Sequence, residues 1–131
     1  MDIFKAFATD EAKVLEGRWV ELGEGAKVRV AREGNRNYVK FLRQKFEEHQ
    51  AALTAGDEAA DDLADKLILE AMSKHILTDW EGIEYKGKKV KYSAKASEEA
   101  LAMPDFRSLV ERLSRELDGY RAKLDEELGK D

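Results

Sequence analysis

The two histidines are the first residues to consider for chemistry, because imidazole can serve as a general base or as a metal ligand. His49 and His75 each fall in a segment of helical pattern, and neither has an acidic residue spaced to complete a two-histidine metal motif. Ser73 lies too close to His75 to signal a nucleophile and its base, and no glycine-framed serine or phosphate-binding loop occurs. We therefore expect structural or surface histidines, no enzymatic activity, no catalytic residue and no cofactor.

An acidic cluster is the second candidate, because carboxylates can bind a divalent cation. It comprises Asp57, Glu58, Asp61, Asp62 and Asp65. The cluster lacks the glycine and the alternating oxygen ligands of a calcium loop. Carboxylates at the start of a helix also oppose the positive end of its dipole, which explains the cluster without a ligand. We predict no metal site.

A basic turn is the third candidate. Its cations are Lys86, Lys88, Lys89 and Lys91. They lie beside Tyr85 and Tyr92, and cations with aromatic rings can bind nucleic acid. The chain as a whole carries a formal charge of −5 with a pI near 5.2, which favours a solvated turn and disfavours nucleic acid or anionic membrane as a partner. A nucleic-acid-binding regulator remains a third hypothesis, and it predicts salt-sensitive binding to oligonucleotides.

Length and composition indicate a small folded protein. The 131 residues are 43% apolar and 39% charged, and they include no cysteine, so packing must supply the stability. We predict one domain over residues 1–131, with possible sub-lobes at 1–77 and 78–131. The sequence shows no export signal and no apolar run long enough to span a bilayer, so we expect a soluble, cytoplasmic protein.

The elements that position these residues begin with a β-hairpin. Val20 and Leu22 alternate with polar neighbours, as do Val28 and Val30, and glycines between the two runs permit a tight reversal. Residues 2–16 lack a clear start signal and are interpreted as a tail that docks on the domain.

A pair of antiparallel helices is predicted next. Asn35 is a good N-cap for a first helix, Gly56 supplies its stop, and Asp57 caps a second helix after a short connection. The apolar positions at helical spacing are Tyr38, Phe41, Leu42, Phe46 and Leu53 in the first helix, and Leu63, Leu67, Ile68, Ala71, Met72 and His75 in the second.

The remaining chain predicts a second hairpin and two helices. Ile83 and Tyr85 would lie on one strand and Val90 and Tyr92 on the other, and Ser93 would cap a short helix. From Pro104 the apolar residues keep one face of a single long helix: Phe106, Leu109, Val110, Leu113, Leu117, Tyr120, Leu124 and Leu128. The predicted fold class is α+β, mainly α.

These apolar faces exceed what one small core needs, and excess apolar helical surface commonly marks a face for a partner. The candidate partner-binding residues are Tyr38, Phe41, Leu63, Leu67, Met72, Trp80, Ile83, Leu113, Leu117 and Tyr120. For each residue taken singly, closing the core or forming a homo-oligomer explains the side chain at least as well. For Trp80 in particular, a place in the core is favoured over direct contact with a partner.

The order of several short motifs resembles a known family. Phe7-Ala8-Thr9-Asp10 is followed by Glu16-Gly17 with Trp19, the Gly23-Glu24-Gly25 turn, and Asn35 with Tyr38. Leu77-Thr78-Asp79-Trp80-Glu81-Gly82-Ile83 then precedes a lysine-glycine turn, Val90-Lys91-Tyr92-Ser93 and Pro104-Asp105-Phe106. In this order they are similar to the tail assembly chaperones of long-tailed bacteriophages and prophages, over nearly the whole chain.

The resemblance implies a non-enzymatic protein made in the cytoplasm of the infected bacterium and absent from the mature virion. Such a protein binds the tape measure protein, keeps it soluble, and helps recruit tail tube subunits. An alternative remains open, in which the chain is a small acidic phage or prophage protein that inhibits a host defence or regulatory protein.

Overall fold

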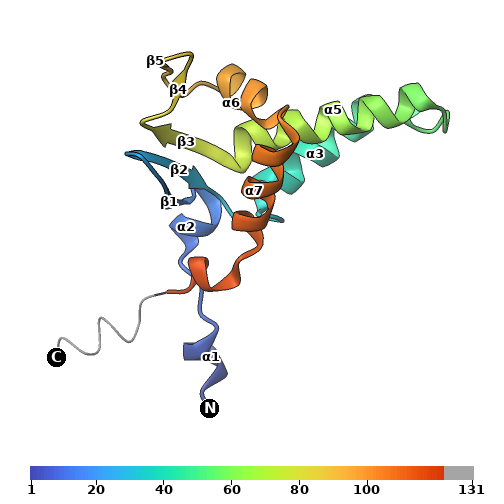
Figure 1. Cartoon of the computed structure of the whole chain (residues 1–131). Helices are drawn as coiled ribbons and strands as arrows, with labels where there is room; N and C mark the ends of the chain where they lie inside the picture. The colour runs from blue at the N-terminus through green and yellow to red at the C-terminus, as the bar shows by residue number, and fades with distance from the viewer. Residues whose placement is uncertain (123–131) are drawn as a thin grey trace.

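A three-stranded antiparallel sheet organises the fold in this computed structural model, which describes residues 1–122 (Figure 1). The strands, in spatial order, are β1 (Arg18–Gly23), β2 (Ala26–Val30) and β3 (Leu77–Glu81). The predicted first hairpin is confirmed, and Glu24 and Gly25 close it with φ angles of 55° and 78°. The third strand was not predicted, because Leu77–Glu81 pairs with β2 only through a long-range contact that sets Val28 opposite Trp80.

The predicted helical hairpin follows β2. It comprises α3 (Arg36–Glu48), the short α4 (Gln50–Leu53) and α5 (Glu58–His75), and its tip projects away from the sheet (Figure 1). Asn35 and Asp57 cap α3 and α5 as predicted, since their side chains accept hydrogen bonds from backbone amides three residues later. The Asn35 amide nitrogen also donates to the carbonyl of His75, so this cap ties the two helices together.

The second hairpin is smaller than predicted. It pairs only β4 (Glu84–Tyr85) with β5 (Lys88–Lys89), and the expected strand residues Val90 and Tyr92 lie beyond it. These two residues contact the core instead: the Trp80 indole donates to the carbonyl of Val90 at 2.8 Å, and the Tyr92 hydroxyl donates to the carbonyls of Ser73 and Leu77. Ser93 caps α6 (Ala94–Leu101) as predicted.

The last helix is shorter than predicted. It forms α7 (Pro104–Arg115) and then gives way to a 3₁₀ turn, η1 (Leu117–Tyr120), so Leu117 and Tyr120 do not extend the α7 face. The Tyr120 hydroxyl donates to the carbonyl of Val30 at 2.9 Å, which draws the chain back onto β2. Leu124 and Leu128, also predicted on this face, lie outside the described residues.

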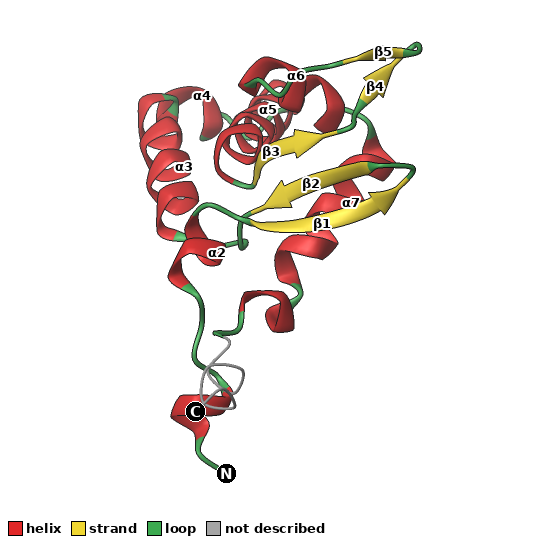
Figure 2. Cartoon of the chain, turned by 90° about the vertical axis from the view of Figure 1, so that its left-hand side faces the viewer, coloured by secondary structure: helices red, strands yellow, loops and turns green. Residues whose placement is uncertain are grey.

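The N-terminal segment forms two short helices, α1 (Ile3–Ala6) and α2 (Glu11–Leu15). Asp2 and Asp10 cap them, so start signals were present in the sequence. The docking of this segment is confirmed around α2, where the Asp10 amide donates to the carbonyl of Tyr120 and the Arg32 amide donates to the carbonyl of Val14. By contrast, α1 extends below the sheet, and Phe4 on it is 85% exposed (Figures 1 and 2).

The core lies between the sheet and three helices, α5, α6 and α7, which cover one face of the sheet (Figure 2). Its buried members are Val28, Val30, Met72, Ile76, Leu77, Trp80, Leu101, Val110 and Leu113. The Trp80 and Tyr92 rings meet edge to face at 5.3 Å. Among residues 1–122, none of the helices combines the length and apolar character needed to cross a membrane. The fold is α+β and mainly helical, as predicted.

Candidate functional site

The structure divides the ten candidate partner-binding residues into three groups. Leu67, Met72, Trp80, Leu113 and Tyr120 are buried in the core. Tyr38, Phe41, Leu63 and Ile83 are half-buried, and Leu117 is 49% exposed. The ten residues therefore do not form one continuous surface, and the buried ones would reach a partner only if the core opened.

A cleft between α3, α5 and α7 brings two of the candidates together. Tyr38 and Met72 line it with Ile68 and Ile76, and the cavity has a volume of about 260 Å³. Ile68 and Met72 fall on one face of α5 because they are spaced four residues apart, and Ile76, the C-cap residue, continues that spacing. Tyr38 reaches the same space from the first turn of α3, where the Asn35 cap fixes the helix start. The result is an apolar floor with a phenol at its side.

Charged residues surround this floor. They are Glu33, before α3, and Arg107, Glu111 and Arg115, one turn apart along α7. The Arg107 guanidinium reaches Asp65 on α5 at 3.0 Å and Glu111 at 3.4 Å, and Arg115 pairs with Glu111 at 3.4 Å and with Glu33. These pairs link the three walls of the cleft. The side chains of Arg115 and Glu33 are 56% and 44% exposed, so their pair contributes little stability and can exchange for a partner's charges.

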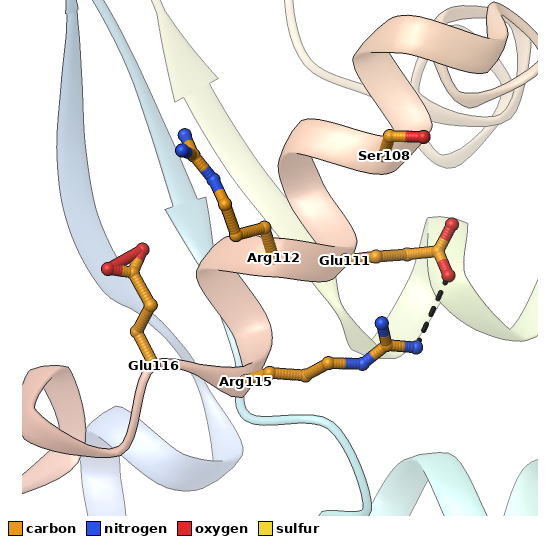
Figure 3. A pocket seen from close by; sticks show the side chains of 5 residues that line it. All are labelled: Ser108, Glu111, Arg112, Arg115 and Glu116. Carbon is orange, nitrogen blue, oxygen red and sulfur yellow. Dashed lines mark hydrogen bonds and ion pairs between the residues drawn. The ribbon is translucent and has the colours of Figure 1, made fainter.

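Figure 3 shows the outer side of the same rim on α7. Glu111 and Arg115 turn toward one another, while Arg112 and Glu116 point to the other side of the helix. With Ser108, these residues line a shallow depression outside the cleft. The Glu111–Arg115 pair, whose members are four residues apart along the helix, therefore borders both the cleft and the open surface.

Burial and charge shift two titrating side chains near the cleft. The pKa of the Tyr38 phenol is raised, chiefly by burial and then by the carboxylate of Glu33, so the hydroxyl stays protonated. Burial, followed by the nearby charge of Lys74, lowers the pKa of His75, which packs against the Phe41 ring at 5.3 Å.

The residues that sequence reasoning missed are the charged rim and two members of the floor, Ile68 and Ile76. Arg107 and Arg115 were not among the candidates, and in the structure they reach Asp65 and Glu33. No local pattern marks such pairs, because the partners are distant in sequence. Among the described residues, no group of three or more histidine or acidic side chains is placed to hold a metal ion.

Fold and cleft together define a small α+β protein with a three-helix cleft of apolar floor and charged rim. The chain belongs to the YdaY prophage protein family, whose model matches residues 33–131. The match covers the helical hairpin, β3 and everything after them, and it leaves out the first hairpin. No curated protein and no solved structure matches the chain. The predicted prophage origin is thus confirmed, and the more specific resemblance to tail assembly chaperones stays a prediction.

Proposed function

We propose that this prophage protein is a non-enzymatic tail assembly chaperone. It binds the tape measure protein, keeps it soluble and helps recruit tail tube subunits. It acts in the cytoplasm of the infected bacterium and is absent from the finished virion. Two things support the proposal: membership of a prophage protein family, and the motif order described above.

The observation that carries the proposal is the cleft between α3, α5 and α7. A tape measure protein is a long helical chain whose apolar faces would aggregate in isolation. Ile68 is the half-buried member of the floor and can accept an apolar side chain from such a helix, and the charged rim can pair with polar residues beside it. The Arg115–Glu33 pair on the rim is about half exposed, so contacts made there can break again and a growing tail tube can displace the chaperone.

Co-expression with the tape measure protein of the same prophage tests this proposal. We expect the parent chain to hold that protein in the soluble fraction and to co-elute with it in size exclusion. Ile68→Glu places a charge on the half-buried floor and should abolish co-elution. Val39→Glu adds the same charge on an exposed position of α3 and should leave co-elution intact.

Circular dichroism confirms that each variant is folded before it is interpreted. If Ile68→Glu unfolds the chain, Arg115→Glu addresses the same cleft from its exposed rim. Loss of co-elution in a folded cleft variant, with Val39→Glu unaffected, supports the proposal. A tape measure protein that stays insoluble with the parent chain refutes it and favours inhibition of a host protein instead.

A further inference from the structure

The β4–β5 hairpin and the segment that follows it carry a concentrated positive charge. Residues 84–95, which we call the lysine patch, contain five lysines and one acidic residue, a net charge of +4 in a chain whose net charge is −5. The lysines are Lys86, Lys88, Lys89, Lys91 and Lys95, and all five are exposed. None of them forms an ion pair within residues 1–122.

A negative charge of similar size lies in the first half of α5. Residues 57–65, which we call the acidic tip, contain five acidic residues and no basic one, a net charge of −5. They are Asp57, Glu58, Asp61, Asp62 and Asp65, and all five are exposed. The helix dipole explains carboxylates in the first turn, but it does not explain Asp62 and Asp65, because its effect falls off beyond that turn.

The two charged surfaces lie on opposite sides of the molecule (Figure 1). The C-terminal end of α5 adjoins β3, whereas its first half projects away from the sheet and from the β4–β5 hairpin. The 18 residues of α5 span about 27 Å, and charges at about 0.1 M salt interact over only about 10 Å. The lysine patch therefore does not neutralise the acidic tip of its own chain, and the two can meet only between copies.

We propose that the lysine patch of one copy binds the acidic tip of a second copy, so that the chain associates head to tail. Charge complementarity argues for this occupant, since exposed surfaces of +4 and −5 face one another across the junction. Because screening limits each charge to its near neighbours, the facing surfaces decide the contact and the net charge of −5 on each copy opposes it little. That same net charge disfavours nucleic acid as the occupant.

One junction leaves a free lysine patch at one end of the pair and a free acidic tip at the other, so further copies can add. The inference does not rest on the proposed function. Sedimentation equilibrium of the parent chain tests it first. At about 0.1 M salt the average mass should rise above the 14.9 kDa of one copy as the concentration approaches about 1 mM, because exposed ion pairs are individually weak. At about 1 M salt, where screening acts within about 3 Å, the association should weaken at least about tenfold.

Two double variants each disable one side of the junction. Lys88→Glu with Lys89→Glu brings the lysine patch to a net charge of zero, and Asp61→Lys with Asp62→Lys brings the acidic tip to −1. Each variant alone should associate at least about tenfold more weakly than the parent. Mixed one to one, they should form a heterodimer with an affinity within about threefold of the parent and nothing larger, because one intact patch can still bind one intact tip.

Two controls make the same charge changes elsewhere. Lys40→Glu with Arg43→Glu lies on exposed positions of α3 and matches the patch variant. Glu21→Lys with Glu24→Lys lies on exposed positions of β1 and its turn and matches the tip variant. Each control should change the association less than about twofold. Circular dichroism establishes that all four variants are folded.

The proposal is overturned by a parent chain that stays monomeric at about 0.1 M salt, by controls that weaken association as much as their matched variants, or by folded variants that form no heterodimer when mixed. If the monomeric parent instead binds an oligonucleotide and Lys88→Glu with Lys89→Glu abolishes that binding, the occupant is nucleic acid. Because the tape measure protein appears in none of these measurements, failure here leaves the proposed function standing, and the reverse also holds.

Discussion

Replacing Gly119 with alanine should destabilise the fold through a single contact. Gly119 lies in η1, and a Cβ built on it would lie 2.3 Å from Nε and 2.5 Å from Cζ of Arg18. Arg18 cannot easily move aside, because its side chain is only 17% exposed. Its guanidinium donates to the carbonyl of Leu113 at 2.9 Å and lies over the Tyr120 ring, 5.2 Å from the centroid.

Forcing an added methyl into such a packed site costs about 1–3 kcal/mol of unfolding free energy. Shortening Arg18 to alanine removes the atoms that the new Cβ would meet. Gly119→Ala should therefore cost about 1–3 kcal/mol in the parent and close to zero in an Arg18→Ala background, so the coupling energy of the double-mutant cycle is of the same size. Urea denaturation of the four proteins, followed by circular dichroism, measures all the terms.

The reasoning fails if Gly119→Ala costs the same in both backgrounds, because its effect would then not pass through Arg18. It also fails if the parent tolerates the substitution without loss of stability. Arg18→Ala alone is itself informative. It removes the side chain that links β1 to the end of α7 and to Glu116. It also removes Nε of Arg18, which among residues 1–122 is the only buried side-chain nitrogen or oxygen without a hydrogen-bond partner.

Three further predictions concern the rest of the fold. Gly82→Ala should cost roughly 2–4 kcal/mol in urea denaturation, because Gly82 has φ +70° and its Cβ would lie 2.2 Å from the backbone oxygen of Gly25, which cannot yield. Tyr120→Phe should cost about 1–3 kcal/mol by the same measurement, since it leaves a buried strand carbonyl without its donor. Burial raises the pKa of Tyr38, Tyr92 and Tyr120, so the stability that their protonated phenols contribute is complete below about pH 10 and is lost as the pH rises further. The midpoint of urea denaturation should therefore fall between pH 8 and pH 11, and the fall should be smaller in Tyr120→Phe.

Local signals predicted much of the fold. Asn35, Asp57 and Ser93 each announce a helix start through a hydrogen bond to a backbone amide nearby in sequence, and all three caps are present. Two features escaped prediction because their causes are distant in sequence. Leu77–Glu81 becomes a strand only by pairing with β2. The α7 helix ends at Arg115 although the apolar period continues, because Tyr120 bonds to β2.

The exposure of the candidate binding residues was harder to predict than the elements, for a related physical reason. Apolar periodicity identifies the face of a helix that will be buried, but it does not identify what buries it. The unpredicted third strand lies next to β2 and adds Leu77 and Trp80 to the core, which also takes up Met72 and Leu113.

What remains for a partner is the apolar surface that the core does not cover. Tyr38 and Ile68 are half-buried at the edge of the cleft, and Tyr85 and Met103 are exposed elsewhere on the surface. Of these four residues only Tyr38 was among the candidates, because the others either continue a stripe assigned to the core or stand outside any long periodic run. A candidate partner surface in a small α+β protein is therefore better sought at the borders of its apolar stripes than at their centres.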